Sequence, residues 1–306
     1  MAEEEKKSAF IAIVGRPNVG KSSLLNAVLG KKVAIVSPKP QTTRTRILGI
    51  LTGGATQLVF IDTPGLFRPR NRLGEYMVRS AMESVSGVDA CLLVAEAGRR
   101  AERPAPGLIE RFQTLDMPAV LALNKVDLLA DKTRLMGQIG EMMGLYAFRA
   151  VVPVSAKTGS GVRDLVGELS ALAAPGGHFF GGDALTDQPE RVLAAEIVRE
   201  KLLRLLGDEI PHGAAVVVEK MEGRPGRPDL TDVFATIYCE RESHKAVIIG
   251  KNGSMLKKIG TSARRDMEKF FECKINLKLW VKVREDWRNR PAVMRTLGYD
   301  GSAFDG

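Results

Sequence analysis

Four residues in the middle of the chain, Asn124, Lys125, Val126 and Asp127, have types and spacing that suit recognition of a purine base. An Asp carboxylate accepts two hydrogen bonds at once, and guanine presents a matching pair of N–H donors at N1 and its exocyclic amine. Adenine lacks both donors and would leave the buried carboxylate unpaired, at a cost of ~3 kcal/mol or more. The pattern therefore favours GTP over ATP as the ligand.

A phosphate-binding pattern lies near the N-terminus. Residues 15–23, GRPNVGKSS, fit G-x-x-x-x-G-K-[ST] and stand between an apolar run at 10–14 and a helical pattern at 24–29. This motif requires a strand, a glycine loop and a helix start, because backbone N–H groups and the helix dipole then face the phosphates. We expect Lys21 to reach the β- and γ-phosphates and the Ser22 hydroxyl to bind Mg²⁺. The predicted nucleotide-binding residues of this loop are Gly15, Asn18, Gly20, Lys21, Ser22 and Ser23.

The tetrapeptide from Asp62 to Gly65, DTPG, ends a second apolar run. We expect Asp62 to bind Mg²⁺ through water and the Gly65 N–H to contact the γ-phosphate. Residues 38–44, PKPQTTR, are polar and contain prolines, which predicts a mobile loop. Held only by metal and γ-phosphate, it would order with GTP and loosen after hydrolysis; the alternative is a solvated connector with no switching role. Thr43 is the predicted second hydroxyl on the metal, with Thr42 as the alternative. The predicted catalytic residues are Lys21, Thr43 and Gly65, and the predicted metal ligands are Ser22, Thr43 and Asp62.

A fifth motif, Ser155-Ala156-Lys157, follows the apolar run at 151–154. We expect the Ala156 N–H to meet O6 of guanine. The triplet alone carries no weight, but here it follows four other motifs in the order expected of GTPases. The predicted base-binding residues are Asn124, Lys125, Asp127, Ser155, Ala156 and Lys157.

Length and composition agree with a globular protein of about two domains, since the chain has 306 residues of which 44% are apolar. No apolar run is long enough to predict a transmembrane helix, and the charged start, MAEEEKK, lacks the apolar centre of a signal peptide. The cysteines and histidines, three of each, are scattered and predict neither a disulfide framework nor a zinc site. We therefore expect a cytoplasmic protein.

Positive charge is concentrated in the C-terminal part of the chain. Residues 241–298 contain fifteen Lys and Arg against six Asp and Glu, and 15 − 6 = +9 equals the net charge of the whole protein. A charge run is usually a solvated face, but here it coincides with the loop described below. The region is where we expect a polyanion to bind.

The order of apolar runs predicts two domains of different architecture. Strands and helical stretches alternate up to about residue 174, which predicts a Ras-like three-layer α/β domain over 8–176. Four glycines within 175–183 interrupt the pattern, and residues 177–189 are the predicted linker. A smaller α+β domain is predicted over 190–298. Its predicted elements are helices at 191–206, from 243 and at 254–271, strands at 214–219, 233–239 and 275–283, and a loop at 222–228.

Within this second domain, residues 247–260, VIIGKNGSMLKKIG, place a G-x-x-G loop between two helical stretches. Two glycines allow close approach of the backbone to phosphates, and the nearby lysines neutralise them. The order of elements around the loop resembles a KH domain of the bacterial-type topology, whose loop clamps about four nucleotides of single-stranded RNA. The predicted RNA-binding residues are Gly250, Lys251, Asn252, Gly253, Lys257 and Lys258.

Taken over residues from about 9 to 300, the chain resembles the Era family of bacterial GTPases. The motifs GRPNVGKSS, QTTR, DTPG, NKVD and SAK, the helical stretch ERVLAAEIVREKLLRLLGDEIPH and the KH loop carry the resemblance. It implies a switch that binds GTP and GDP with Mg²⁺, hydrolyses GTP, binds rRNA near the 3′ end of the small subunit and assists assembly of the 30S subunit. It also implies a loose, peripheral association with the inner face of the cell membrane. We expect the protein to be a monomer.

The residue after the DTPG motif is Leu66, where Ras-like enzymes place a glutamine that orients water. The family shares this apolar residue, and slow intrinsic hydrolysis is expected. Arg68, Arg70 and Arg72 follow, and we interpret them as solvated or facing RNA. Asn18 lies at the loop position that coordinates K⁺ in related GTPases without an arginine finger, which predicts K⁺ as a second cofactor; equally, Asn18 could simply tighten the loop turn.

Two other functions fit part of the sequence. The protein could bind RNA and use GTP as a structural or regulatory ligand with negligible hydrolysis. It could also be a GTPase of tRNA modification or membrane division, but the KH loop and the lack of another catalytic domain count against that reading.

Overall fold

The computed structural model describes residues 5–98, 104–131, 133–207 and 209–299. Contacts between Cα atoms divide the chain into two compact units, each described here by itself. The first unit contains the residues up to Ala34, Thr43–Pro69 and Met77–Asp187. The second contains Ile35–Thr42, Arg70–Tyr76 and the residues from Gln188 onward.

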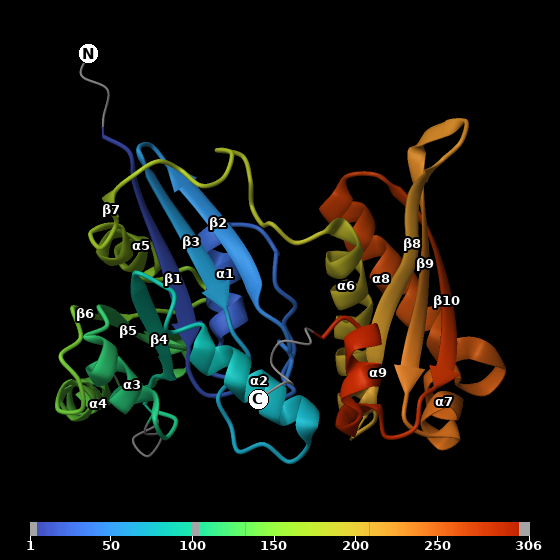
Figure 1. Ribbon diagram of the computed structural model, residues 1–306, viewed down its shortest axis with the longest axis horizontal. Coiled ribbons are helices and arrows are strands. Elements are labelled where there is room, and N and C mark those ends of the chain that lie inside the picture. Colours follow the sequence, from blue (N-terminus) through green and yellow to red (C-terminus); the bar gives the residue numbers. More distant parts are fainter. Residues whose placement is uncertain (1–4, 99–103, 132, 208, 300–306) are drawn as a thin grey trace. The chain divides into compact units, whose positions relative to one another are not determined.

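A seven-stranded sheet forms the centre of the first unit, with strand order β2-β3-β1-β4-β5-β6 and β7 paired to the start of β1 (Figure 1). Strand β2 runs antiparallel to β3, whereas β3, β1, β4, β5 and β6 are parallel. The strands are β1 Lys7–Val14, β2 Ile47–Gly53, β3 Thr56–Asp62, β4 Ala90–Glu96, β5 Ala119–Asn124, β6 Ala150–Pro153 and β7 Ala174–Pro175. Because the parallel strands end at one edge, the loops after β1, β3 and β5 meet there.

Helices cover both faces of this sheet. One apolar core joins it to α1 (Lys21–Leu29) and α5 (Val162–Ser170). The other joins it to α2 (Arg72–Glu83), α3 (Leu108–Leu115) and α4 (Thr133–Met143). Successive residues of β1, such as Ile11 and Ala12, belong to opposite cores, which explains why its sequence is apolar at every position from Ala9 to Val14. The predicted Ras-like three-layer architecture is confirmed.

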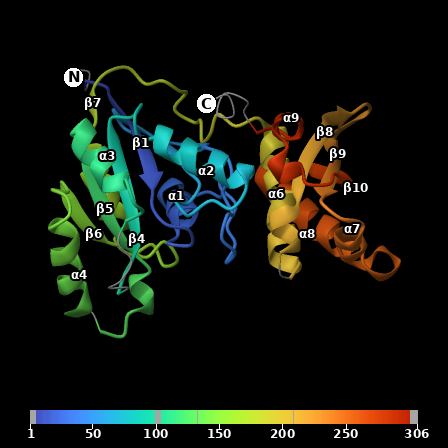
Figure 2. The ribbon, with the colours of Figure 1, turned by 60° about the horizontal axis from the view of Figure 1, so that its bottom comes forward.

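The second unit contains a three-stranded sheet of order β10-β9-β8, in which β8 and β9 are antiparallel and β9 and β10 are parallel. Figure 2 shows α6 and α8 side by side against this sheet. The elements are α6 Glu190–Leu205, β8 Ala215–Arg224, β9 Arg227–Cys239, α7 Glu242–Ile249, α8 Ser254–Phe271, β10 Lys274–Val283 and α9 Pro291–Thr296. Short 3₁₀ turns lie at Val126–Leu128, Ile210–Gly213, Lys251–Gly253 and Trp287–Asn289. The apolar core lies between the helices and one face of the sheet, and the predicted KH architecture is confirmed.

The loop predicted over residues 222–228 is wrong. Strand β8 continues to Arg224 and β9 begins at Arg227, so the chain turns within two residues, and Gly226 has the positive φ of 75° that this turn needs. Arg224 pairs with Asp232 across the hairpin at 2.5 Å, which stabilises the extended strands. The glycines, prolines and arginines of residues 222–228 therefore form a tight turn together with the ends of the two adjoining strands.

The glycine-rich stretch after β7 lies along the first unit. The Gln57 carboxamide accepts hydrogen bonds from the backbone N–H groups of Phe179 and Phe180 at 2.8 and 3.0 Å. The Ile50 N–H donates to the Leu185 carbonyl at 2.9 Å. Residues 179–185 are thus held by the edge strand β2 and by its neighbour β3.

Candidate nucleotide-binding and RNA-binding sites

The phosphate loop turns where glycine is required. Gly15 and Gly20 have φ angles of 147° and 97°. A Cβ atom on Gly20 would lie 2.2 Å from the Nδ2 atom of Asn124, and one on Gly15 would lie 2.3 Å from the Val94 carbonyl oxygen. Both positions therefore exclude a side chain, and the loop can pack against the ends of β4 and β5.

Lys21 begins helix α1 directly after this loop and is 6% exposed. Its Nζ atom donates to the carbonyl oxygens of Gly15 and Arg16 at 3.2 and 3.0 Å. Burial lowers the pKa of Lys21 to about 8, and the nearby Asp62 carboxylate partly opposes this shift. The ammonium is thus held inside the loop that would surround a phosphate.

Three side-chain oxygens converge next to Lys21. The Ser22 hydroxyl lies 2.6 Å from Asp62 Oδ2 and 2.8 Å from the Thr43 hydroxyl, and the Thr43 hydroxyl donates to the same Asp62 oxygen at 3.3 Å. The second oxygen of Asp62, Oδ1, is buried and has no hydrogen-bond partner among the described residues. Burial raises the pKa of Asp62 to about 6, against the opposing effect of Lys21. Two hydroxyls and a buried carboxylate with a spare oxygen fit Mg²⁺, which prefers oxygen ligands.

Thr43 and Thr42, the two candidates for the second hydroxyl on the metal, have different surroundings. Thr43 is 7% exposed and faces Asp62. Thr42 turns the other way, and its hydroxyl contacts the Ser37 hydroxyl at 2.8 Å and donates to the Lys39 carbonyl at 2.7 Å. The geometry therefore favours Thr43 as the residue near the metal.

Asn124 connects the phosphate loop to the Ser-Ala-Lys loop. Its Nδ2 atom donates to the Val19 carbonyl at 2.9 Å, and its Oδ1 atom accepts the Ala156 N–H at 3.0 Å. The N–H that we expected to face the guanine O6 atom thus bonds Asn124 in this structure. The Asn124 side chain is 2% exposed, and both its nitrogen and its oxygen form hydrogen bonds. It therefore links the phosphate loop to the Ser-Ala-Lys loop.

Asp127 and Lys125 are each oriented by a buried or half-buried partner. The Ser155 hydroxyl, which is fully buried, donates to Asp127 Oδ1 at 2.7 Å. Lys125 has a φ of 69° and its ammonium lies 2.6 Å from the Glu96 carboxylate at the end of β4. Asp127 itself is exposed, with one carboxylate oxygen held by Ser155.

Gly65 brings the end of the DTPG motif against the phosphate loop. A Cβ atom there would lie 2.8 Å from the backbone of Pro17. The next residue, Leu66, donates its N–H to the Gly15 carbonyl at 3.1 Å, and its side chain is buried in the core with α3 and α4. Leu66 therefore packs into the core.

The remaining predicted nucleotide-binding residues lie at the rim. Asn18 is exposed at the tip of the phosphate loop with a φ of 64°, Ser23 is half-buried in α1, and Lys157 is exposed. Arg68 and Arg70 are also exposed, and Arg72 forms an ion pair with Glu75 at 3.5 Å.

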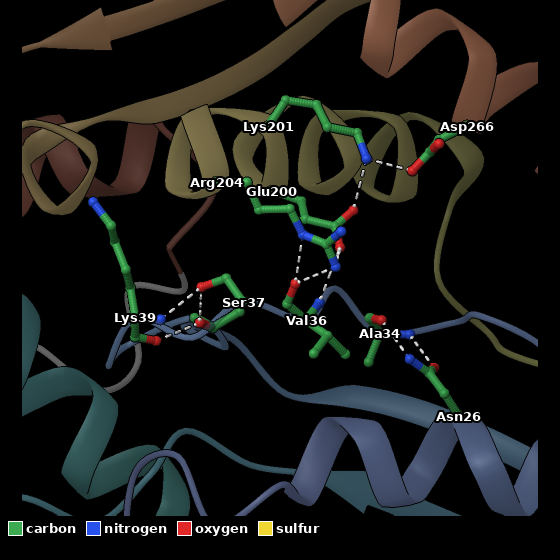
Figure 3. A network of polar contacts seen from close by, with 10 residues as sticks. Asn26, Ala34, Val36, Ser37, Lys39, Glu200, Lys201, Arg204 and Asp266 are labelled. Carbon is green, nitrogen blue, oxygen red and sulfur yellow. Dashed lines mark hydrogen bonds and ion pairs between the residues drawn. The ribbon is translucent and has the colours of Figure 1, made fainter. Parts of the chain in front are cut away.

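The segment between α1 and Thr43 contacts α1 through Asn26 and α6 through Val36 (Figure 3). Asn26 of α1 binds its start, accepting the N–H groups of Val33 and Ala34 and donating to the Ala34 carbonyl at 2.7 Å. Residues 35–42, here called the switch segment, belong to the second unit together with α6. The expectation that metal and γ-phosphate alone hold this loop is therefore wrong.

Side chains of α6 supply the contacts to the switch segment. Arg204 donates twice to the Val36 carbonyl, at 3.1 and 2.8 Å, and Glu200 accepts the Val36 N–H at 3.4 Å. Arg199 donates to the Thr42 carbonyl, and Lys39 of the segment donates to the Leu206 carbonyl at 2.6 Å. The sequence patterns did not identify these residues. The signal that could have identified them is a run of three charged residues within an apolar helical stripe: Arg199, Glu200 and Lys201.

The G-x-x-G loop joins α7 to α8. Gly250 and Gly253 have φ angles of 72° and 75°, and Asn252 between them has 52°. A Cβ atom on Gly250 would lie 2.8 Å from the Met255 Cβ atom, whereas one on Gly253 would meet nothing within 4 Å. The space beside Gly253 is therefore open, and a phosphate could approach the backbone there.

A groove of about 380 Å³ runs from this loop between α8 and β10. Leu256, Leu277 and Leu279 line it with apolar surface, and Gly260 allows α8 to approach Leu279. Lys257 and Arg264 line the same groove, and the predicted RNA-binding residues Lys251 and Asn252 are exposed in the loop. The predicted Lys258 is exposed too, but it lines a different hollow, together with Leu205 and Arg265. The apolar residues of this groove suit contact with RNA bases, and its cationic side chains suit contact with phosphates.

Together these features define a P-loop GTPase domain followed by a KH domain, and family models described as 50S ribosome-binding GTPase and KH domain match residues 10–125 and 209–288. A GTPase Era of Ruminiclostridium cellulolyticum is 46% identical over 293 residues, covering 96% of this chain and 97% of that protein. The chain therefore belongs to the Era family and is a GTPase.

Other relatives and solved structures agree. A GTPase Era of Clostridioides difficile is 46% identical over 294 residues, covering 96% of this chain and 99% of that protein. A crystal structure of an Aquifex aeolicus Era variant bound to GDP·AlF4⁻ matches with a TM-score of 0.90 at 38% identity. A structure of Era in complex with MgGDPNP and nucleotides 1506–1542 of 16S ribosomal RNA matches with a TM-score of 0.90 at 37% identity. Both matches cover 96% of this chain and 99% of the other. Among the described residues, none forms a helix long and apolar enough to span a bilayer.

Proposed function

We propose that the protein is a GTP-hydrolysing switch that binds small-subunit rRNA near its 3′ end through the KH domain and assists maturation of the 30S subunit. The observation that carries the proposal is the convergence of Ser22, Thr43 and Asp62 beside Lys21, in a chain that also has the G-x-x-G groove. The related Era structure with MgGDPNP and 16S rRNA nucleotides supports both ligands.

In this proposal each residue near the phosphates has a separate task. Ser22 and Thr43 would hold the metal with their hydroxyls, and Asp62 would contribute the oxygen that has no hydrogen-bond partner among the described residues. When bound, Mg²⁺ supplies positive charge to the β- and γ-phosphates. Lys21 moves its ammonium from loop carbonyls to phosphate oxygens, and Gly65 presents its N–H to the γ-phosphate.

The base is selected by Asp127, whose second oxygen completes the pair of acceptors for the guanine N–H groups. Ser155 orients that carboxylate from a buried position, and Asn124 keeps the two base-reading loops together. Because Leu66 is buried in the core, this chain positions the attacking water with other groups and turns over slowly by itself. We include K⁺ beside Asn18 as a second cation, supported by the position of Asn18 at the exposed tip of the phosphate loop.

The competing function is an RNA-binding protein that uses GTP as a structural or regulatory ligand with negligible hydrolysis. Single-turnover hydrolysis of GTP, with and without the 16S rRNA fragment 1506–1542, separates the two. We expect measurable hydrolysis that depends on Lys21 and Mg²⁺. Hydrolysis no faster than that of GTP in buffer, under both conditions, would favour the competing function.

The same proposal includes a cytoplasmic monomer that associates peripherally with the inner face of the cell membrane. Its support is the family resemblance. Sedimentation equilibrium tests the monomer, and co-sedimentation with vesicles of anionic lipid tests the membrane association.

A further inference from the structure

The sheet of the second unit has two different faces. Its strand β10 pairs on one side with β9 and forms the edge of the sheet (Figure 1). Alternate residues of β10, including Leu277 and Leu279, pack toward the helices and line the groove. The residues between them, Lys278, Trp280 and Lys282, are exposed on the opposite face of the same strand.

An aromatic pair lies on that opposite face. The rings of Trp280 and Phe234 are stacked, with centroids 6.0 Å apart and planes inclined by 20°. The Lys278 ammonium lies 5.6 Å from the Phe234 centroid, a cation–π arrangement. Trp280 is nevertheless 44% exposed, whereas the chain's other tryptophan, Trp287, is fully buried and donates its indole N–H to the Gly213 carbonyl. Phe234 therefore supports one side of the indole and leaves much of its surface available.

The charges around the indole favour an anionic partner. Lys278 and Lys282 flank Trp280 on the same face, and within the described part of the chain neither forms an ion pair. The acidic residues of this face have partners: Asp232 pairs with Arg224, Glu222 pairs with Lys220 at 2.6 Å, and Glu219 accepts the Thr236 hydroxyl at 2.8 Å. A stacking ring between two lysines suits a base between two phosphates better than it suits an apolar protein surface.

We infer that Trp280, Lys278 and Lys282, here called the outer β10 surface, form a second contact for single-stranded RNA, on which a base beyond those in the groove stacks. The inference rests on the proposed RNA binding of the KH groove. Leu279 of the groove and Trp280 are neighbours on one edge strand, so a strand that leaves the groove across this edge reaches the indole directly. The RNA footprint is accordingly longer than the four nucleotides that a G-x-x-G loop clamps.

The test compares RNAs of different length. The 16S rRNA fragment 1506–1542 is shortened one nucleotide at a time from each end, and the shortest RNA whose binding still depends on Gly253 defines the groove ligand. Trp280→Ala should weaken longer RNAs about ten-fold, the size expected for loss of one stacked base, and should leave the shortest RNA within two-fold. Trp280→Phe should retain the affinity, and Lys220→Gln, a charge on β8 of the same face, should have no effect.

Fluorescence gives an independent readout, because Trp280 and Trp287 are the two tryptophans. Longer RNAs should quench the emission of the native protein, and this quenching should be lost in Trp280→Phe and absent with the shortest RNA. Circular dichroism and GTP affinity confirm that each variant is folded. Equal effects of Trp280→Ala on all lengths, or none on any, would overturn the inference while leaving the groove intact. If instead Gly253→Asp changes no RNA affinity, the proposed function itself fails.

Discussion

The hydroxyl of Ser22, in the first turn of α1, lies 2.6 Å from the Oδ2 atom of Asp62 at the end of β3. The two residues are forty positions apart, and the parallel pairing of β1 with β3 brings them together. Since the Thr43 hydroxyl lies 2.8 Å from that of Ser22, a small cation at this point is within reach of three side chains.

Asp62→Asn tests the role of this point in metal binding. The variant keeps the shape of the side chain and removes its charge, so GTP affinity in Mg²⁺ should fall at least ten-fold and approach the affinity in EDTA. Titration with a fluorescent GTP analogue in either condition measures the change. A variant that still gains affinity from Mg²⁺ as the native protein does would exclude Asp62 from the metal site.

The raised pKa of Asp62, about 6, predicts how the stability of the nucleotide-free protein depends on pH. The folded state holds the proton more tightly than the unfolded chain, so this stabilisation is complete below the unfolded pKa near 4 and is lost as the pH rises through about 6. Asp62→Asn removes the dependence. The free energy of unfolding of the variant minus that of the native protein should therefore increase between pH 4 and 7, by ~3 kcal/mol. Urea unfolding at each pH measures it, and a constant difference would contradict the assigned pKa.

Asp127→Asn should exchange the base preference. The amide can donate to the C2 carbonyl of xanthine but cannot accept both N–H groups of guanine, so GTP affinity should fall by a factor of about 100 and XTP should bind. Competition between labelled GTP and unlabelled GTP, XTP or ATP measures the preference, with Arg163→Gln, at an exposed residue of α5, as the control. Comparable affinity of the native protein for ATP and GTP would refute the base assignment.

Gly253→Asp should abolish binding of single-stranded rRNA and leave GTP affinity within two-fold. A side chain at Gly253 meets nothing within 4 Å, so the change adds a negative charge at the phosphate position with little disturbance of packing. At Gly250 the same change would collide with Met255, so the test is made at Gly253 alone. Filter binding measures the RNA affinity, and Gly226→Asp, in the β8–β9 turn, controls for a charge at a glycine of positive φ.

Asn18 should make hydrolysis depend on K⁺ if its side-chain oxygen holds the ion between the β- and γ-phosphates. Native GTP hydrolysis should then be several-fold faster in K⁺ than in Na⁺ at equal ionic strength, and Asn18→Ala should lose the difference. GTP affinity of the variant shows whether Asn18 also shapes the loop turn. Native rates that are the same in both salts would remove K⁺ from the mechanism.

The meeting of Lys21, Ser22 and Asp62 in the fold could be predicted from sequence, because their motifs are local signals at or just after strand ends. Lys21, Asp62 and Asn124 each follow an apolar run, and parallel strands place such residues at one edge of the sheet. The role of the Ala156 N–H was harder to predict, because Asn124 accepts it and that bond depends on the spacing of two loops.

The contacts of α6 could not be predicted in the same way. Glu200 is fully buried, and its partners are Val36, 164 positions away, and the neighbouring cations Lys201 and Arg204. Lys201 also pairs with Asp266 of α8. The periodicity of a sequence identifies the apolar stripe of a helix. It does not identify which charged residues of that helix will bind a backbone segment that is distant in the sequence. Both strands of the β8–β9 hairpin were predicted, but their ends near the turn were not, because an ion pair across the strands replaces apolar alternation there.

The attachment of the switch segment to α6 has a practical consequence for dissecting the protein. A shortened chain ending at Asp187 would retain every GTPase motif, yet it would lose Arg199, Glu200 and Arg204, which bind the backbone of Val36 and Thr42. Thr43 would then be connected to a tether with far more conformational freedom, and ordering it around the metal would carry a larger entropic cost. Rates and affinities measured on such a fragment would describe a different enzyme from the intact one.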